Sequence, residues 1–169
     1  MNKLYILCGI PFSGKSTLAK EIINRPEYIR IDLDDVKFDL YGSSVKDSDL
    51  KQKDWDIIYK KMYGMIEDFL KQGKFVVHDT GNFTKHERRL VRQIADKLKL
   101  QTITIFVDVP KSIAYERLML NRTSKNRFDV NDEEFESAVN EMEPPTKEEN
   151  FLVFNVEDDL NSWIHKYFD

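Results

Sequence analysis

The sequence predicts a three-layer α/β fold, in which a five-stranded parallel sheet lies between two layers of helices. Two observations support this prediction. Five short apolar runs alternate with amphipathic helical segments, and strands that alternate with helices form parallel sheets covered on both faces. A glycine-rich loop follows the first apolar run directly, at the kind of strand-to-helix turn that forms a ligand crevice. The 169 residues are enough for one hydrophobic core, so we expect a single domain over 1–169.

The expected strands are the apolar runs at 4–8, 28–31, 74–78, 102–107 and 151–155. Helices are predicted between them by apolar side chains at three- and four-residue steps. The expected helices cover 17–24, a segment that ends at Tyr41, the stripe from Trp55 to Phe69, a segment behind the capping box Thr84-x-x-Glu87, another behind Asn131-x-x-Glu134, and 157–168. Capping boxes of this form mark helix starts. The order of these elements therefore supports the parallel sheet.

Composition narrows the possible functions. The chain carries 30 acidic and 26 basic side chains, for a net charge of −4, whereas nucleic-acid platforms usually show a basic excess. No segment reaches the ~20 apolar residues of a membrane span, and we expect a cytoplasmic protein without a membrane partner. The single cysteine, Cys8, falls at the end of an expected buried strand. Its expected role is that of a small buried hydrophobe.

The segment from Gly9 to Thr17 matches the pattern G-x-x-x-x-G-K-[ST] and lies between an expected strand and an expected helix. In that context the glycines let backbone N–H groups point at a polyphosphate, and the helix start favours negative charge. Lys15 supplies a charge for the outer phosphates, and Ser16 supplies a hydroxyl for Mg²⁺. We therefore expect ATP and Mg²⁺ as cofactors. The expected nucleotide-binding residues are Pro11, Phe12, Ser13, Gly14, Lys15, Ser16 and Thr17.

Aspartates follow three of the four remaining expected strands, and parallel strands end at the ligand crevice. Asp79 fits the carboxylate of a Mg²⁺ shell. Period-two alternation would place Asp32 and Asp34 on the same side, where the pair suits a general base beside a metal or a substrate hydroxyl. Any single aspartate could instead cap a helix or form a turn. Asn82 and Thr80 are candidates for contact with the acceptor or for capping a helix.

The polar stretch 121–130 carries three basic residues, Arg122, Lys125 and Arg127. Its composition also fits a solvated loop, but its place between two late helices favours a short lid that brings arginines to the phosphates. On the helical stripe, Trp55, Tyr59 and Tyr63 are candidates for lining an acceptor pocket. A core position is the simpler interpretation of Trp55 and Met62, which lie on the apolar stripe.

These segments together resemble the small P-loop kinases of the AAA_33 type, the group around phage polynucleotide 5′-hydroxyl kinase. The resemblance is carried by 9–17, 31–35, 79–82 and 108–110, and it covers nearly the whole chain. It implies a P-loop NTPase fold in which Asp34 takes the proton from the acceptor hydroxyl and lies beside the metal. It also implies that Lys15, with Arg122 or Arg127, neutralises charge on the moving phosphoryl group.

One position departs from the polynucleotide kinases, which carry arginine three residues after the base. Here that position is Lys37, whose ammonium offers charge to a substrate without the bidentate fork of arginine. With Asp32 and Asn82, it completes the expected substrate side. We therefore expect a kinase that acts on a small-molecule hydroxyl, with a polynucleotide 5′ end as the alternative acceptor.

A nucleotide-dependent switch, or an ATPase without an acceptor, is a further alternative. The tetrad Asp39-Leu40-Tyr41-Gly42 matches D-x-x-G, but it falls in or after a helical segment, and no N-K-x-D motif is present. The identity of the acceptor, the preference for ATP over GTP and the oligomeric state are left open by the sequence.

Overall fold

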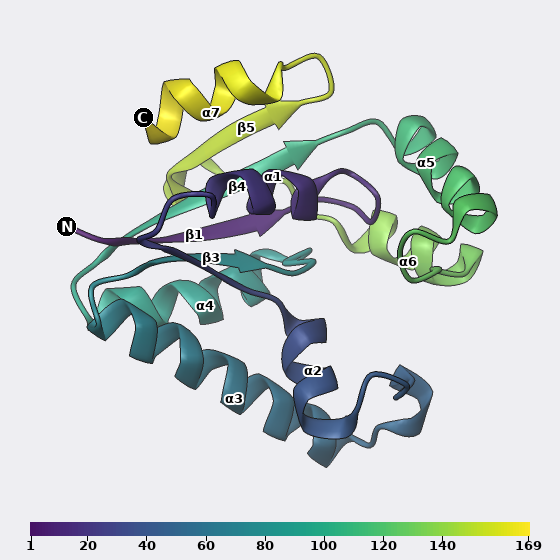
Figure 1. The fold of residues 1–169 in the computed structure, drawn as a ribbon, viewed down its shortest axis with the longest axis horizontal. Helices are drawn as coiled ribbons and strands as arrows, with labels where there is room; N and C mark the ends of the chain where they lie inside the picture. The colour runs from purple at the N-terminus through teal and green to yellow at the C-terminus, as the bar shows by residue number, and fades with distance from the viewer.

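The computed structural model describes all residues from 1 to 169 and contains five strands (Figure 1). The strands are β1 (Lys3–Cys8), β2 (Tyr28–Ile31), β3 (Phe75–Asp79), β4 (Gln101–Asp108) and β5 (Phe151–Asn155). They form one parallel sheet in the order β2-β3-β1-β4-β5. The helices are α1 (Lys15–Ile22), α2 (Leu33–Tyr41), α3 (Gln52–Lys71), α4 (Lys85–Lys97), α5 (Lys111–Ser124), α6 (Asp132–Glu141) and α7 (Leu160–Phe168). Short 3-10 turns cover Asp47–Asp49 and Lys147–Glu149. The predicted α/β fold with a five-stranded parallel sheet is confirmed.

Alternation along β1 directs its side chains into two separate cores, one on each face of the sheet. Leu4 and Ile6 are fully buried in a core that includes side chains of α2, α3 and α4. Tyr5 and Leu7 belong to the other core, which includes side chains of α1, α5, α6 and α7. Figure 1 shows α3 and α4 beneath the sheet and α1 and α7 on its other side. A buried central strand therefore holds the three layers together.

β1 lies in the centre of the sheet, between β3 and β4. The chain leaves β1 toward β2 on one side and later reaches β4 on the other side. Such a switch point opens a crevice at the carboxyl end of the central strand. Leu7 of β1 is paired in register with Asp79 of β3, so the loop that follows β1 begins beside the aspartate that ends β3. No helix is both long enough and apolar enough to cross a membrane.

The helix starts follow the predicted caps closely. Thr84 and Asn131 each form a capping box, with the glutamate three residues further on. The last helix begins at Leu160, later than the predicted residue 157, because the Asp159 side chain accepts a hydrogen bond from the Ser162 N–H at 2.9 Å. The first helix begins at Lys15, earlier than predicted, because the turn of the glycine-rich loop continues directly into it.

Two predictions of local structure were wrong. The predicted strand-like alternation does not extend to Asp32 and Asp34, because β2 ends at Ile31. Asp32 instead caps α2, and Asp34 lies in the first turn of that helix. The predicted lid 121–130 is not all loop, because α5 continues to Ser124 and ends at Lys125 in a left-handed conformation. The non-helical part of this segment thus begins at residue 125.

A buried ion pair fixes the loop after β3 to the segment before β5. Arg88 of α4 donates from Nε to Glu149 Oε1 at 2.7 Å and from Nη2 to Glu149 Oε2 at 3.0 Å. Its Nη1 donates to the carbonyl oxygens of Asn82 and Phe83. Both side chains of the ion pair are almost fully buried. The loop that follows β3 is therefore held in place by buried contacts with α4 and with Glu149.

Candidate active site

The loop from Gly9 to Gly14 has a backbone shape that side chains would disturb. Gly9 has a φ of 153°, and a Cβ atom there would lie 2.7 Å from the Val107 carbonyl oxygen. Gly14 has a φ of 104° and is the N-cap of α1, which has no side-chain cap. The first N–H groups of α1 are therefore not satisfied by a capping side chain, and unsatisfied N–H groups at a helix start bind anions. This geometry supports the predicted phosphate-binding role.

Lys15 lies across this loop and donates hydrogen bonds from Nζ to Gly9 O at 2.7 Å and to Ile10 O at 2.9 Å. Burial lowers the pKa of its ammonium group to about 8, although the carboxylate of Asp79 acts in the opposite direction. Ser16, the predicted Mg²⁺ ligand, follows in the first turn of α1 and is partly exposed. Thr17 is exposed on the same turn. Lys15 and Ser16 are thus both located where the loop continues into α1.

Arg117 of α5 is a residue of this site that the sequence prediction missed. Its Nη1 donates to the carbonyl oxygens of Phe12 at 3.2 Å and Ser13 at 2.9 Å. Ser13 is buried, and its hydroxyl oxygen has no hydrogen-bond partner. Arg117 therefore fixes the backbone of the phosphate loop through its carbonyl oxygens. The sequence did contain a signal for Arg117, because it is an arginine close to the apolar residues Ile113, Ala114 and Leu118 of the same helix.

The lid brings one of its two predicted arginines to the phosphate loop. The guanidinium of Arg127 lies 4.5 Å from the centroid of the Phe12 ring. The side chain of Asn121 holds the Arg127 backbone through two hydrogen bonds, from Nδ2 to Arg127 O and from the Arg127 N–H to Oδ1. Arg122 instead pairs with Asp129 and Asp132, at 3.2 and 2.8 Å. In this structure Arg122 stabilises the lid, and Arg127 is the arginine that lies over the loop.

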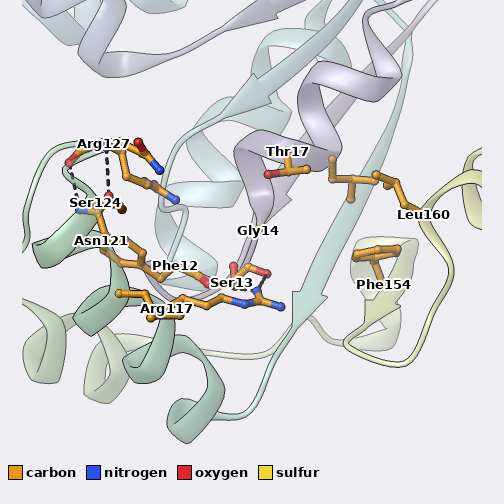
Figure 2. Close-up of a pocket in the computed structure, with 13 residues that line it drawn as sticks. Phe12, Ser13, Gly14, Thr17, Arg117, Asn121, Ser124, Arg127, Phe154 and Leu160 are labelled. Carbon is orange, nitrogen blue, oxygen red and sulfur yellow. Dashed lines mark hydrogen bonds between the residues drawn. The ribbon is translucent and has the colours of Figure 1, made fainter.

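A cavity of about 430 Å³ lies between the phosphate loop, the lid and the start of α7. Figure 2 shows Phe12, Ser13 and Arg117 on one side of it and Phe154 and Leu160 on the other. Sites for small molecules typically measure ~300–1,000 Å³ and combine apolar walls with a few polar groups. Phe154 and Leu160 offer such apolar walls, and the sequence analysis did not select them. The cavity is large enough for the base and sugar of a nucleotide.

On the other side of the crevice, one arginine holds three carboxylates. Arg30 of β2 donates from Nε to Asp79 Oδ2 at 2.7 Å and from Nη1 to Asp35 Oδ2 at 3.0 Å, and its Nη2 contacts Asp32. Burial raises the pKa of Asp32 to about 6, although Arg30 and the Asp34 N–H act in the opposite direction. Arg30 was not selected from the sequence, because its partners lie on β3 and α2.

Asp34 has different surroundings from Asp32. Its side chain is largely exposed, and Oδ1 accepts a hydrogen bond from Lys37 Nζ at 2.7 Å. The same ammonium donates to Asp47 Oδ1 at 2.8 Å and is itself buried. Asp34 and Lys37, which were predicted separately as base and substrate residue, are therefore joined by an ion pair.

Asn82, the third predicted substrate residue, is turned toward the core. It has a φ of 47° and is 4% exposed. Its Nδ2 donates to Leu7 O at 2.8 Å and lies 3.2 Å from His78 Nδ1. Burial lowers the pKa of His78 to about 3, so its imidazole is neutral. The amide group of Asn82 thereby links the β3 end to the strand that precedes the phosphate loop.

The donor atoms at the crevice fit Mg²⁺ that is held mainly by phosphates and water. No group of three or more His, Cys, Asp or Glu side chains is arranged to hold a metal ion. Mg²⁺ usually takes one or two protein oxygens together with substrate phosphates and several waters. Asp79 is buried beside the loop with only its Oδ2 bonded to Arg30, and Ser16 offers a hydroxyl. The residues present suit such a shared site.

Comparison with solved structures shows that several kinases share this fold. A sugar kinase from Janibacter sp. HTCC2649 superposes with a TM-score of 0.70 at 13% identity, over 98% of this chain and 92% of that one. The Mycobacterium tuberculosis APS kinase CysC, in complex with AMPPNP and APS, gives a TM-score of 0.66 at 16% identity, over 98% and 94%. A chain of the Pnkp1/Rnl/Hen1 RNA repair complex gives 0.68 at 22% identity, over 83% of this chain and 44% of that one.

The sequence itself supports a family assignment. No curated protein sequence matches this chain. The sequence model of the AAA_33 family, described as an AAA domain, matches residues 4–145. That span runs from β1 to the segment after α6 and includes the phosphate loop, the aspartates at the ends of β2 and β3, and the lid. The chain belongs to the AAA_33 family.

Proposed function

We propose that this protein is an ATP-dependent kinase that transfers the γ-phosphate of ATP to a hydroxyl group of a small-molecule acceptor. One observation carries the proposal: the phosphate loop and the carboxylates at the ends of β2 and β3 lie at the same edge of the sheet, where Arg30 joins Asp79 to Asp32. The pairing of Leu7 with Asp79 supports this, because it starts the loop beside that carboxylate. Solved structures with this fold include a sugar kinase and an APS kinase.

The donor side of the reaction is assigned to the loop and the lid. Lys15 and the N–H groups of α1 would bind the β- and γ-phosphates, and Arg127 would neutralise charge that develops on the transferred group. Lys15 would then exchange its bonds with loop carbonyls for bonds with phosphate oxygens. Arg122 contributes by holding Asp129 and Asp132. Ser16, with Asp79 or Asp34, would hold Mg²⁺, which would supply positive charge against the phosphates.

The acceptor side is assigned to Asp34 as general base. Both carboxylate oxygens of Asp32 are already engaged, Oδ1 by the Asp34 N–H and Oδ2 by Arg30. Asp34 is more exposed, and only its Oδ1 is bonded, to Lys37. A base must come within hydrogen-bond reach of the proton that it removes. The available oxygen of Asp34 meets that requirement better, so Asp34 takes the hydroxyl proton while the γ-phosphate bond to ADP breaks.

A polynucleotide 5′ end is the alternative acceptor, and one solved structure with this fold belongs to an RNA repair complex. The surroundings of Lys37 weaken this alternative. Its ammonium is buried and already bonded to Asp34 and Asp47. A substrate phosphate would have to compete with both carboxylates for that charge. A small neutral or cationic acceptor meets no such competition.

Labelled ATP and an acceptor panel of sugars, amino sugars, nucleosides and oligonucleotides test the proposal. The sharpest variant is Asp34→Asn, which should keep ATP binding within about twofold and lose at least ~100-fold in transfer, in the range of general-base effects. Asp39→Asn, at an exposed position of the same helix, is the matched control. Transfer to no member of the panel would refute the proposed kinase activity. Unchanged transfer by the Asp34→Asn variant would refute the role of Asp34 as general base.

A further inference from the structure

A second, smaller cavity lies on the acceptor side, among α2, α3, α4 and the loop that follows β3. Its volume is about 150 Å³, well below the ~300–1,000 Å³ of sites for whole small molecules. Leu33 and Thr80 line it, and these residues are adjacent in the chain to Asp34 and Asp79. The cavity therefore has room for one small group of an acceptor whose hydroxyl lies at the proposed base.

The residues that line this cavity carry no positive charge. Lysine and arginine are absent among them, and the one carboxylate is that of Glu87. Tyr59 and Tyr63 present two aromatic rings whose centroids are 5.9 Å apart. His78, which also lines the cavity, is neutral. An anionic group would find no counter-charge here, whereas a cation is attracted both to aromatic faces and to a carboxylate.

Asn82 adds a hydrogen-bond acceptor to the cavity wall. Its side chain is more than nine-tenths buried, and both of its close contacts, with Leu7 O and His78, use Nδ2. Its Oδ1 has no donor from the protein, and Asn82 lines the cavity. A ligand in the cavity that donates a hydrogen bond would give this oxygen a partner.

The carboxylates that act on Tyr59 and Tyr63 work in the same direction, and the guanidinium of Arg88, which donates to the Asn82 and Phe83 carbonyl oxygens, is paired with Glu149. Burial raises the pKa of the Tyr59 and Tyr63 phenols, and the negative charge of Glu87 raises both further. Asp47 adds to this effect at Tyr59. The field of these carboxylates therefore reaches the two rings that would contact the ligand.

We infer that this cavity binds the ammonium group of the acceptor, which makes the acceptor an amino alcohol or amino sugar. The inference rests on the proposed kinase for the fate of the hydroxyl group, but not for the binding of the amine. The ammonium contacts the Tyr59 and Tyr63 faces, the Glu87 carboxylate and Asn82 Oδ1. A hydroxyl group of the same molecule then lies toward Asp34.

Binding of matched pairs tests this inference without any turnover. Glucosamine is compared with glucose, and 3-amino-1,2-propanediol with glycerol, by isothermal titration at pH 6.5 with saturating AMP-PNP and Mg²⁺. We expect the amine of each pair to bind at least about tenfold more tightly, which corresponds to ~1.4 kcal/mol. Equal binding of amine and hydroxyl compound, or binding of neither, would overturn the inference.

Variants locate the effect in this cavity. Glu87→Gln keeps a residue that can complete the capping box with Thr84, so α4 is expected to remain folded. It should reduce the preference for the amine to less than about threefold, and Tyr63→Leu should reduce it in the same way. Glu148→Gln removes an exposed carboxylate that pairs with Lys85 and should leave the preference unchanged. An undiminished preference in both cavity variants would overturn the assignment of the site.

Transfer from labelled ATP, measured with the same pairs, separates this inference from the proposed function. Tight binding of the amine without phosphorylation would support the cavity and refute the kinase. Equal phosphorylation of glucose and glucosamine would support the kinase and overturn the cavity assignment.

Discussion

The guanidinium of Arg127 lies 4.5 Å from the centroid of the Phe12 ring, so the lid and the phosphate loop are in direct contact. The next lid residue, Phe128, packs on Phe38 of α2 with ring centroids 5.2 Å apart. Two consecutive residues thereby contact the donor loop and the helix that carries Asp34. The position of the lid is coupled by these contacts to both sides of the crevice.

Replacing Arg127 should affect the chemical step more than ATP binding. In Arg127→Gln, we expect kcat to fall by roughly 100-fold or more, since arginines that stabilise transferred phosphoryl groups contribute at least this much. KM for ATP should rise less than about tenfold, because Lys15 and the helix start, which we propose as the phosphate-binding groups, are unchanged in this variant. Steady-state kinetics of Lys125→Gln, another exposed lid cation, provides the control. Equal losses in both variants would contradict a specific role for Arg127.

Arg30 should matter for stability, because Asp79 is buried and depends on it. Arg30→Gln removes the charge that neutralises Asp79, Asp32 and Asp35. Leaving a buried carboxylate without its partner costs about 1–3 kcal/mol or more, and urea unfolding would measure this loss. Arg25→Gln removes an ion pair to Asp169 at the surface, where we expect a loss of about 0–1 kcal/mol. Similar losses in the two variants would show that Arg30 is not required to hold Asp79.

The sheet, the phosphate loop and the capped helices could be predicted because their signals are local. Apolar period, glycines at a strand-to-helix turn and capping boxes all lie within a few residues of the structure that they specify. The arrangement of Asp32 and Asp34 was not predicted correctly, because the alternation assumed extended backbone as far as Asp34, whereas β2 ends at Ile31 and α2 begins at Leu33. A helix rotates the side chains differently from a strand. Asp32 is the N-cap of α2, and which aspartate takes this position depends on the residue at which β2 ends.

The pairing of the arginines could not be predicted from the sequence for a different reason. Arg30 meets Asp79, 49 residues away, and Arg117 meets the phosphate loop, more than 100 residues away. Composition shows that 121–130 is basic but does not show that Asp129 and Asp132 engage Arg122. Ion pairs between distant segments depend on packing, which spacing along the chain does not encode.

The buried pair of Arg88 and Glu149 should contribute strongly to stability. Breaking a buried ion pair by removing one partner typically costs about 3–5 kcal/mol, and we expect this from Glu149→Gln in urea unfolding. The double replacement Arg88→Met with Glu149→Leu should be less destabilised than that single variant, because the fully buried Arg88 charge is removed together with its partner, while the partly exposed Arg92 keeps its hydrogen bonds to Thr104 and the Glu149 carbonyl oxygen. A double variant that is as unstable as the single one would contradict this explanation.

The same pair predicts a specific response to acid. Burial alone would raise the pKa of Glu149, but hydrogen bonds from Arg88 and the Thr146 N–H outweigh burial and lower it. A carboxylate whose pKa is lowered by folding stabilises the folded protein at any pH above its unfolded-state pKa of ~4.3. This stabilisation is lost as the pH falls from that value through the folded-state pKa. Below about pH 4.3, the wild type should therefore lose stability more steeply than Glu149→Gln. Parallel curves for the two proteins would argue against the assignment.

Cys8 offers a direct probe of how firmly the phosphate loop is held. Its thiol is fully buried directly before Gly9, and burial raises its pKa to about 12. Because only the thiolate reacts with disulfide reagents, the native protein should be labelled by Ellman's reagent at pH 8 only as fast as it opens. AMP-PNP at 100 times its Kd stabilises the folded state by about 2.7 kcal/mol, so labelling should slow by up to roughly 100-fold if opening releases the nucleotide. Prompt labelling of the native protein, or labelling that the nucleotide does not slow, would show that Cys8 becomes accessible without opening of the nucleotide site.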